Sequence, residues 1–170
     1  MYGSEGRTWW QRHVLTRLKL HIGADADSGL VHTVVATAAN VGDVTQAGAL
    51  LHGNEENVYG DAGYQGAEKR EENQGRAVSW HVALRPGKRR ALPDTPQGRF
   101  LDQLERVKAQ IRSKVEHPFH VLKNLLAYRK TRYRGLAKNA AHLNTLMGLV
   151  NLKLAAKRLM PLQGSGASIA

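Results

Sequence analysis

Cysteine is absent from the 170 residues. Its absence excludes disulfides, thiolate zinc sites and a cysteine nucleophile, and it is compatible with a reducing compartment. Long apolar runs are absent as well, because no stretch approaches the roughly 18 uninterrupted apolar residues that a membrane helix needs. The opening residues 1–17 contain charges and two adjacent Trp where a signal peptide would have an apolar core. We therefore expect a soluble, cytoplasmic protein with no membrane partner.

Acidic residues are scarce in the C-terminal half. From Arg99 to Arg158 the chain has 14 Lys and Arg but only 3 Asp and Glu, whereas residues 1–98 have 11 of each. The whole net charge of +11 therefore lies in the second half. A solvated basic face would account for such a bias. A polyanion, above all nucleic acid, is the partner that the composition favours.

The order of the predicted elements is that of an α/β protein. Alternation and turn residues predict strands at 16–23, 30–38, 57–61 and 77–84, the first two joined as a hairpin by the turn 25–29. Apolar spacing predicts helices at 42–53, with Asp43 as N-cap, at 66–75, from Arg99 to about 126, and at about 136–159. Pro118 either kinks the third helix or begins a new one. The segment 85–98 is predicted to be a loop, and the whole a mixed sheet with covering helices.

Asp61 ends a predicted strand and is followed at once by small residues, in NVYGDAGYQG (57–66). Open α/β sheets gather their active sites at the C-terminal ends of strands, and Gly60 and Gly63 would let other groups approach. An Asp that caps a turn would account for the same sequence.

A second acid, Glu116, lies between two bases in RSKVEHPFHVLK (112–123). If the helix continues through Pro118, Arg112, Glu116 and Lys123 lie on one helix face. A solvated row of ion pairs has this spacing too. Mg²⁺ prefers carboxylate oxygens, however, and phosphoryl transfer uses metal ions together with Lys or Arg on the phosphate. We therefore interpret a strand-borne Asp61 and a helix-borne Glu116 as a candidate metal site.

The segment AYRKTRYRGLAKN (127–139) interleaves bases with two tyrosines. It is either an exposed basic loop or a DNA-facing segment in which the bases contact phosphates and a Tyr ring stacks on a base. The bases are Arg129, Lys130, Arg132, Arg134 and Lys138, and the rings are Tyr128 and Tyr133. Nearby, His117 and His120 are three residues apart; phosphate contact or packing is favoured over zinc, since further ligands are missing.

Two long segments resemble the bacterial insertion-sequence transposases of the DDE class, in the group named after insertion sequence five. They are HIGADADSGLVHTVVATAANVGDVTQAGALLHGNEENVYGDAGYQGAEKR and RSKVEHPFHVLKNLLAYRKTRYRGLAKNAAHLNTLMGLVNL. The resemblance implies an RNase H-like fold and an Asp, Asp, Glu triad that binds two Mg²⁺ (or Mn²⁺) ions to cut and join DNA ends. It implies that Asp61 is the second Asp and Glu116 the Glu.

The signature Y-x2-R-x3-E-x6-K of this family maps onto Arg112, Glu116 and Lys123, with Ala109 in place of the usual Tyr. The resemblance thus implies that Arg112 and Lys123 contact DNA. The implied partners are double-stranded DNA, at the terminal inverted repeats of an insertion sequence, and a second copy or a full-length transposase.

The first Asp of the triad is expected on a strand upstream of LKLHIGAD (18–25), yet residues 1–17 do not resemble the family. Asp25 and Asp27 are predicted to be hairpin-turn residues. We expect an atypical segment 1–17, a partial RNase H-like domain 18–160 and a disordered tail 161–170. The first, central strand of the sheet is expected to be missing unless residues 5–16 replace it. The expected function is DNA transposition by a truncated chain that is inactive alone; a non-catalytic DNA-binding fragment that occupies element ends or inhibits full-length transposase is the alternative.

Overall fold

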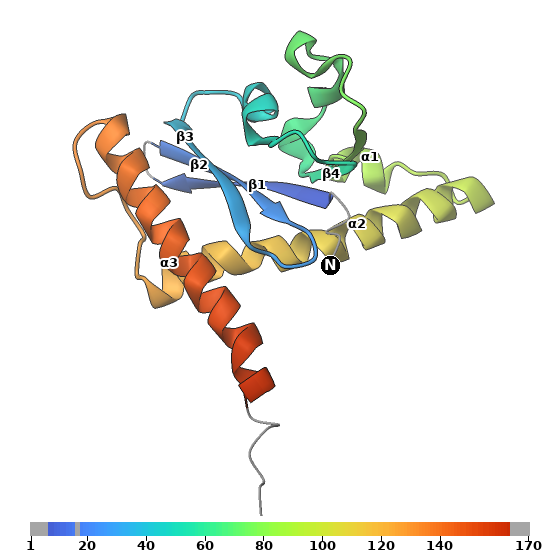
Figure 1. The fold of residues 1–170 in the computed structure, drawn as a ribbon. Coiled ribbons are helices and arrows are strands. Elements are labelled where there is room, and N and C mark those ends of the chain that lie inside the picture. Colours follow the sequence, from blue (N-terminus) through green and yellow to red (C-terminus); the bar gives the residue numbers. More distant parts are fainter. Residues whose placement is uncertain (1–6, 16–17, 164–170) are drawn as a thin grey trace, which may run out of the picture.

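The computed structural model describes residues 7–15 and 18–163, and its centre is one five-stranded sheet (Figure 1). The spatial order of the strands is β3-β2-β1-β4-β5. Pairing is antiparallel between β1 and β2 and between β2 and β3, and parallel between β1 and β4 and between β4 and β5. The strands are β1 (Arg7–Leu15), β2 (Leu18–Asp25), β3 (Val31–Ala38), β4 (Asn57–Gly60) and β5 (Ser79–Val82).

The central position of the sheet is filled, which corrects the expectation that the first strand is missing. β1 pairs along its whole length with β2, from Thr8 opposite Asp25 to Leu15 opposite Leu18. On its other side it pairs with β4, with Trp10 opposite Gly60. The predicted domain boundary at residue 17 therefore falls between two strands of the same sheet. The order and directions of the strands are those of the RNase H-like fold that the family resemblance implies.

The β2–β3 hairpin forms as its sequence predicts. Asp25 closes the turn, since its Oδ1 accepts a hydrogen bond from the backbone N of Ser28 at 2.5 Å. Gly29 adopts φ 62°, a left-handed conformation that glycine takes at no steric cost. β2 is buried on both faces, because Leu20 and Ile22 point to one side and His21 to the other. Helices or turns must therefore cover both sides of the sheet.

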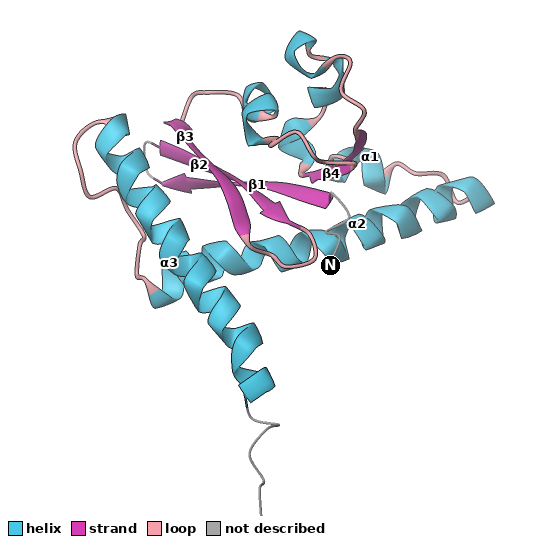
Figure 2. Cartoon of the chain, in the orientation of Figure 1, coloured by secondary structure: helices cyan, strands magenta, loops and turns pink. Residues whose placement is uncertain are grey.

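Two long helices cover one face. α2 (Pro96–His120) packs on β1 and β4, and α3 (Leu136–Gln163) packs on β3. Figure 2 shows both helices as the longest elements of the chain, each extending past the sheet at one end. Thr95 caps α2 by accepting a hydrogen bond at Oγ1 from Gly98 N, 3.1 Å away. Their shared core contains Leu20, Ile22, Phe119, Leu122, Leu143, Met147 and Val150.

Pro118 does not end α2. The helix continues through it to His120 and then widens into a π turn, η6 (Val121–Leu125). The segment predicted to be a loop at 85–98 contains a short helix, α1 (Pro86–Arg90), whose first residue is a proline placed where helices tolerate it.

The other face is covered by short 3₁₀ turns, where helices were predicted at 42–53 and 66–75. Asp43 does not act as the N-cap, because Gly42 holds that position and Asp43 is the first residue of the turn that follows. A second, smaller core lies beneath, around Leu50, Val58 and Tyr64. The turns are η1 (Asp43–Gln46), η2 (Gly48–Leu50), η3 (Ala62–Tyr64), η4 (Ala67–Lys69) and η5 (Glu71–Asn73).

None of the helices within residues 7–15 and 18–163 is both long and apolar enough to cross a membrane.

Candidate active site and nucleic-acid interface

Asp61 is the first residue after β4, at the C-terminal end of the strand. It is the N-cap of η3, and its Oδ1 accepts a hydrogen bond from the backbone N of Gly63 at 2.7 Å. This is the turn-capping geometry that the sequence left open as an alternative. The cap fixes the direction of the carboxylate, and one of its oxygens accepts the bond from Gly63.

A second carboxylate lies beside Asp61, and sequence reasoning had placed it in a helix cap. A Cβ atom added at Gly63 would lie 2.6 Å from Oδ2 of Asp43 and 2.9 Å from Oδ1 of Asp61. Both acids therefore crowd the same glycine. Asp43 is buried and forms an ion pair with Lys19 Nζ at 3.1 Å. Lys19 also donates to the carbonyl of Val41 at 2.7 Å, so it anchors the turn η1 to β2.

A buried polar chain supports the same turn from below. The hydroxyl of Tyr64 and Nδ1 of His21 are 3.0 Å apart, and Nε2 of His21 is 3.1 Å from Oγ1 of Thr37. All three side chains are buried. Because buried polar groups are costly to leave unpaired, these hydrogen bonds fix η3, and with it Asp61, against β2 and β3.

Glu116 lies on α2 and is half exposed, with 54% of its side chain accessible. Arg112, one helical turn earlier, places its Nε 3.9 Å from Oε1 of Glu116, as the four-residue spacing predicts. Lys123 lies in the π turn η6, beyond the α-helical part. A π turn has more residues per turn than an α-helix, so Lys123 is rotated out of the row that a continuous helix would form.

One cavity is lined by the residue before Asp61 and by the ion-pair partner of Glu116. It has a volume of about 230 Å³ and lies between the ends of β4 and β5 and the underside of α2. Gly60, which directly precedes Asp61, lines it on the sheet side, while Ala109 and Arg112 line it on the helix side. Ala109 is the position where the family pattern has Tyr, so no ring occupies this wall.

Glu105, which sequence reasoning missed, fixes α2 over this cavity. Its carboxylate is buried, accepts a hydrogen bond from Leu84 N at 2.9 Å and pairs with Lys108 Nζ at 2.8 Å. Lys108 in turn donates to the carbonyl of Val82, the last residue of β5, at 3.2 Å. Nothing in the local sequence distinguishes Glu105 from a solvated helix acid. Its ion pair with Lys108 has the three-residue spacing of an exposed helix pair, and its other partner, Leu84, lies 21 residues earlier in the chain.

The acids do not form a complete metal site within the described ranges. There, no three His, Cys, Asp or Glu side chains are arranged to hold one ion. β1 has the sequence RTWWQRHVL and supplies neither Asp nor Glu. Asp25 is the last residue of β2, directly before the hairpin turn, and its carboxylate bonds to Ser28. The donor chemistry of Asp61 and Glu116 suits Mg²⁺, but the number of acids falls short of the triad.

The basic segment 127–139 begins as an exposed loop and enters α3 at Leu136. Arg129, Lys130, Arg132, Arg134 and Lys138 are exposed or nearly so. The two tyrosines differ: Tyr133 is 50% exposed, whereas Tyr128 is 1% exposed and packs in the main core. The suggestion that Tyr128 stacks on a base is therefore wrong for this conformation, and only Tyr133 offers an accessible ring. Burial also raises the pKa of the Tyr128 hydroxyl above its usual value.

The strand order, with a helix crossing β1 and β4, defines an RNase H-like α/β fold. The family model described as the transposase DDE domain matches residues 4–152, and the chain belongs to this family. Members of the family act on DNA. Among solved structures, the chain is similar to the catalytic core domain of BIV integrase, with 10% identity over 97% of this chain and 88% of that one, at a TM-score of 0.40.

Proposed function

We propose that this protein binds duplex DNA at the ends of an insertion sequence of the group named after insertion sequence five, with Asp61 and Glu116 as the acids at its reaction centre. The observation that supports this is the cavity under α2. Gly60, next to Asp61, and Arg112, paired with Glu116, both line it. In a member of the transposase DDE family, a cavity lined by the neighbour of a strand-end Asp and by the ion-pair partner of a helix-borne Glu is where DNA would be cut.

The roles of the individual residues follow from their chemistry. Asp61 and Glu116 would bind Mg²⁺ or Mn²⁺, and a bound ion would supply Lewis-acid stabilisation of charge on phosphate oxygens. Arg112 and Lys123 would bind DNA phosphates beside it, and the exposed bases Arg129, Lys130, Arg132, Arg134 and Lys138 would extend that contact. Because β1 supplies no acid, we derive no cleavage step and expect this chain to be inactive alone.

A second function is favoured by the same lack of an acid on β1. The chain would then be a non-catalytic DNA-binding protein that occupies element ends, or that inhibits a complete transposase by assembling with it. Both functions require DNA binding, and they differ in whether adding one carboxylate can restore chemistry.

DNA binding tests both. We expect the affinity for duplex DNA to fall steeply between about 50 and 200 mM salt, since each phosphate neutralised by Lys or Arg releases condensed counterions. Fluorescence anisotropy of a labelled duplex measures this directly. Affinity that is insensitive to salt would contradict the proposal. Asp61→Ala and Glu116→Ala are the matched controls, because removing an acid should leave salt-sensitive binding intact.

Restoring an acid separates the two functions. Trp10 pairs with Gly60, the residue before Asp61, so an Asp introduced at Trp9, Trp10 or Gln11 would stand on the strand next to Asp61. Cleavage of element ends with Mg²⁺ or Mn²⁺ by one of these variants, and its loss on adding Asp61→Ala, is the expected result for a reaction centre. Folded, DNA-binding variants that never cleave would favour the non-catalytic function.

A further inference from the structure

The turn of the β2–β3 hairpin, α2 and α3 line a second cavity. Its volume is about 420 Å³, and it is lined by Asp27, Ser28 and Gly29 from the turn, His117 from α2, and Leu154, Lys157 and Arg158 from α3. It shares no lining residue with the cavity beside Asp61.

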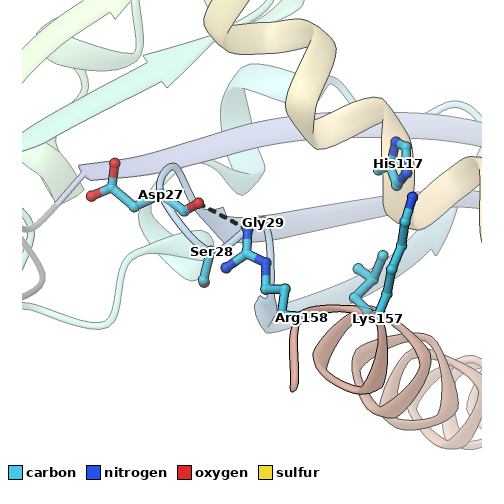
Figure 3. A pocket seen from close by; sticks show the side chains of 7 residues that line it. Asp27, Ser28, Gly29, His117, Lys157 and Arg158 are labelled. Atoms are coloured by element: carbon cyan, nitrogen blue, oxygen red, sulfur yellow. Dashed lines mark hydrogen bonds between the residues drawn. The ribbon is translucent and has the colours of Figure 1, made fainter. Parts of the chain in front are cut away.

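The walls of this hairpin cavity are fixed in place. Asn151 of α3 bonds twice to the backbone of Val31, its Oδ1 accepting from N at 2.8 Å and its Nδ2 donating to O at 2.7 Å. Two helical turns further along α3, Arg158 Nη2 donates to the carbonyl of Asp27 at 3.0 Å. Figure 3 shows this bond, with Lys157 directed from α3 toward His117. The helix is thus tied to the hairpin at two points, which keeps the cavity open between them.

The cavity continues into a groove between α2 and α3. A neighbouring hollow of about 380 Å³ shares His117, Leu154 and Lys157 with it. It adds the polar His120, Asn124 and Lys153 and the apolar Val121 and Leu125. The hairpin cavity and this hollow together bring three permanent cations, two imidazoles, a hydroxyl and an amide to one surface. Among the described residues that line them, Asp27 is the single acid. Such a surface is built to bind an anion that presents several oxygens.

We infer that this cavity and groove bind backbone phosphates of DNA, with Lys157 as the central contact and His117, Ser28 and Lys153 beside it. The inference rests on the proposed function, since DNA is taken as the source of the phosphate. Position supports that choice: His117 directly follows Glu116 on α2, so a strand leaving the reaction centre would reach the groove along the same helix. The dimensions exceed those of a single phosphate, which favours a chain of them over a free ion.

Lys157→Gln tests the inference by removing one charge from a side chain that makes no hydrogen bond to the described part of the chain. We expect its affinity for duplex DNA to fall roughly five- to tenfold at low salt, and the slope of log affinity against log salt to decrease by about one phosphate contact. Lys157→Arg should retain the affinity. Lys69→Gln is the matched control, because Lys69 is exposed in the half of the chain without excess positive charge and should change little.

The outcomes separate the inference from the proposed function. If the wild-type chain binds DNA with the expected salt dependence but Lys157→Gln behaves like Lys69→Gln, the groove is not a DNA contact and the inference fails alone. If the wild-type chain does not bind DNA, both fail.

The His117 ring resonances, followed by NMR, distinguish the two sources of phosphate. We expect a short duplex to shift them at far lower concentration than inorganic phosphate, and Lys157→Gln to weaken both effects. Inorganic phosphate that saturates the site and is not displaced by DNA would show a site for a free anion, which overturns the assignment to DNA.

Discussion

The sheet half of the molecule (residues 7–82) differs from the helical half (residues 96–163) in its charge and in how its side chains are paired. The sheet half has nearly balanced charge, and its polar side chains are tied down by partners such as Lys19 for Asp43 and Tyr64 for His21. The helical half contains the excess positive charge. It also leaves large apolar side chains such as Phe100, Leu152 and Met160 exposed.

The two candidate acids differ in the same way. Asp61 lies in a turn fixed by a cap, a buried polar chain and two glycines, whereas Glu116 is half exposed on a helix and paired with Arg112 at 3.9 Å. This difference indicates that the sheet half holds its acid in a fixed position, whereas the helical half presents its acid on an exposed, charged surface. A partner large enough to contact both halves, as DNA is, would meet a rigid acid on one side and a charged helix on the other.

The largest expected effect tests how much the buried face of the helical half contributes to the core that it shares with the sheet. Leu122 is 0% exposed and packs against the sheet, whereas Leu104 is 41% exposed on the same helical stretch. Leu122→Ala should reduce the free energy of unfolding by about 2–5 kcal/mol through lost burial and a cavity. Leu104→Ala should change it by less than about 0.5 kcal/mol. Urea denaturation of both variants measures this, and equal losses would break the comparison between buried and exposed faces.

The long, periodic elements could be predicted from the sequence and the short ones could not. The hairpin and both long helices lie close to their predicted ranges, because their apolar spacing persists over many residues. The segments 42–53 and 66–75 have helical spacing too, but they are too short to be stable helices without packing, and the sheet face accommodates them as 3₁₀ turns.

The contacts of the candidate site that join residues distant in the sequence could not be predicted either. Asp61 at a strand end and Arg112 beside Glu116 follow from local spacing. The packing of Asp43 beside Gly63, and the bonds of Glu105 to Leu84, join residues about 20 positions apart, which no local pattern records. Whether β1 occupies the centre of the sheet was equally beyond local sequence, because only its pairing with β2 and β4 establishes that place.

An intermediate effect tests how tightly the sheet half fixes Asp61. Gly63→Ala would place a methyl group 2.6 Å from Oδ2 of Asp43 and 2.9 Å from Oδ1 of Asp61, so one carboxylate must move. We expect a loss of about 1–3 kcal/mol in the free energy of unfolding. Gly42→Ala is the matched control, since its new methyl group would meet only Thr45 Cγ2 at an ordinary 3.8 Å. If both variants are equally stable, the turn is looser than the close contacts at Gly63 indicate.

The smallest expected effect is a loss of stability at acidic pH, and it should come from histidines of the sheet half. Burial, followed by the charge of His52, lowers the pKa of His32 below its ordinary 6.5, and nearby Glu55 and Asp25 offset only part of that shift. Burial, followed by Lys108, likewise lowers the pKa of His81. A histidine whose pKa is lowered in the folded state binds its proton more readily when the chain is unfolded. Its contribution to the free energy of unfolding is therefore fully present above pH 6.5, and it is lost as the pH falls toward the pKa of the folded state. Urea midpoints should therefore decrease modestly between about pH 7.5 and pH 5.5. His32→Gln should flatten that decrease, and a wild-type midpoint that rises in acid would contradict the burial of these rings.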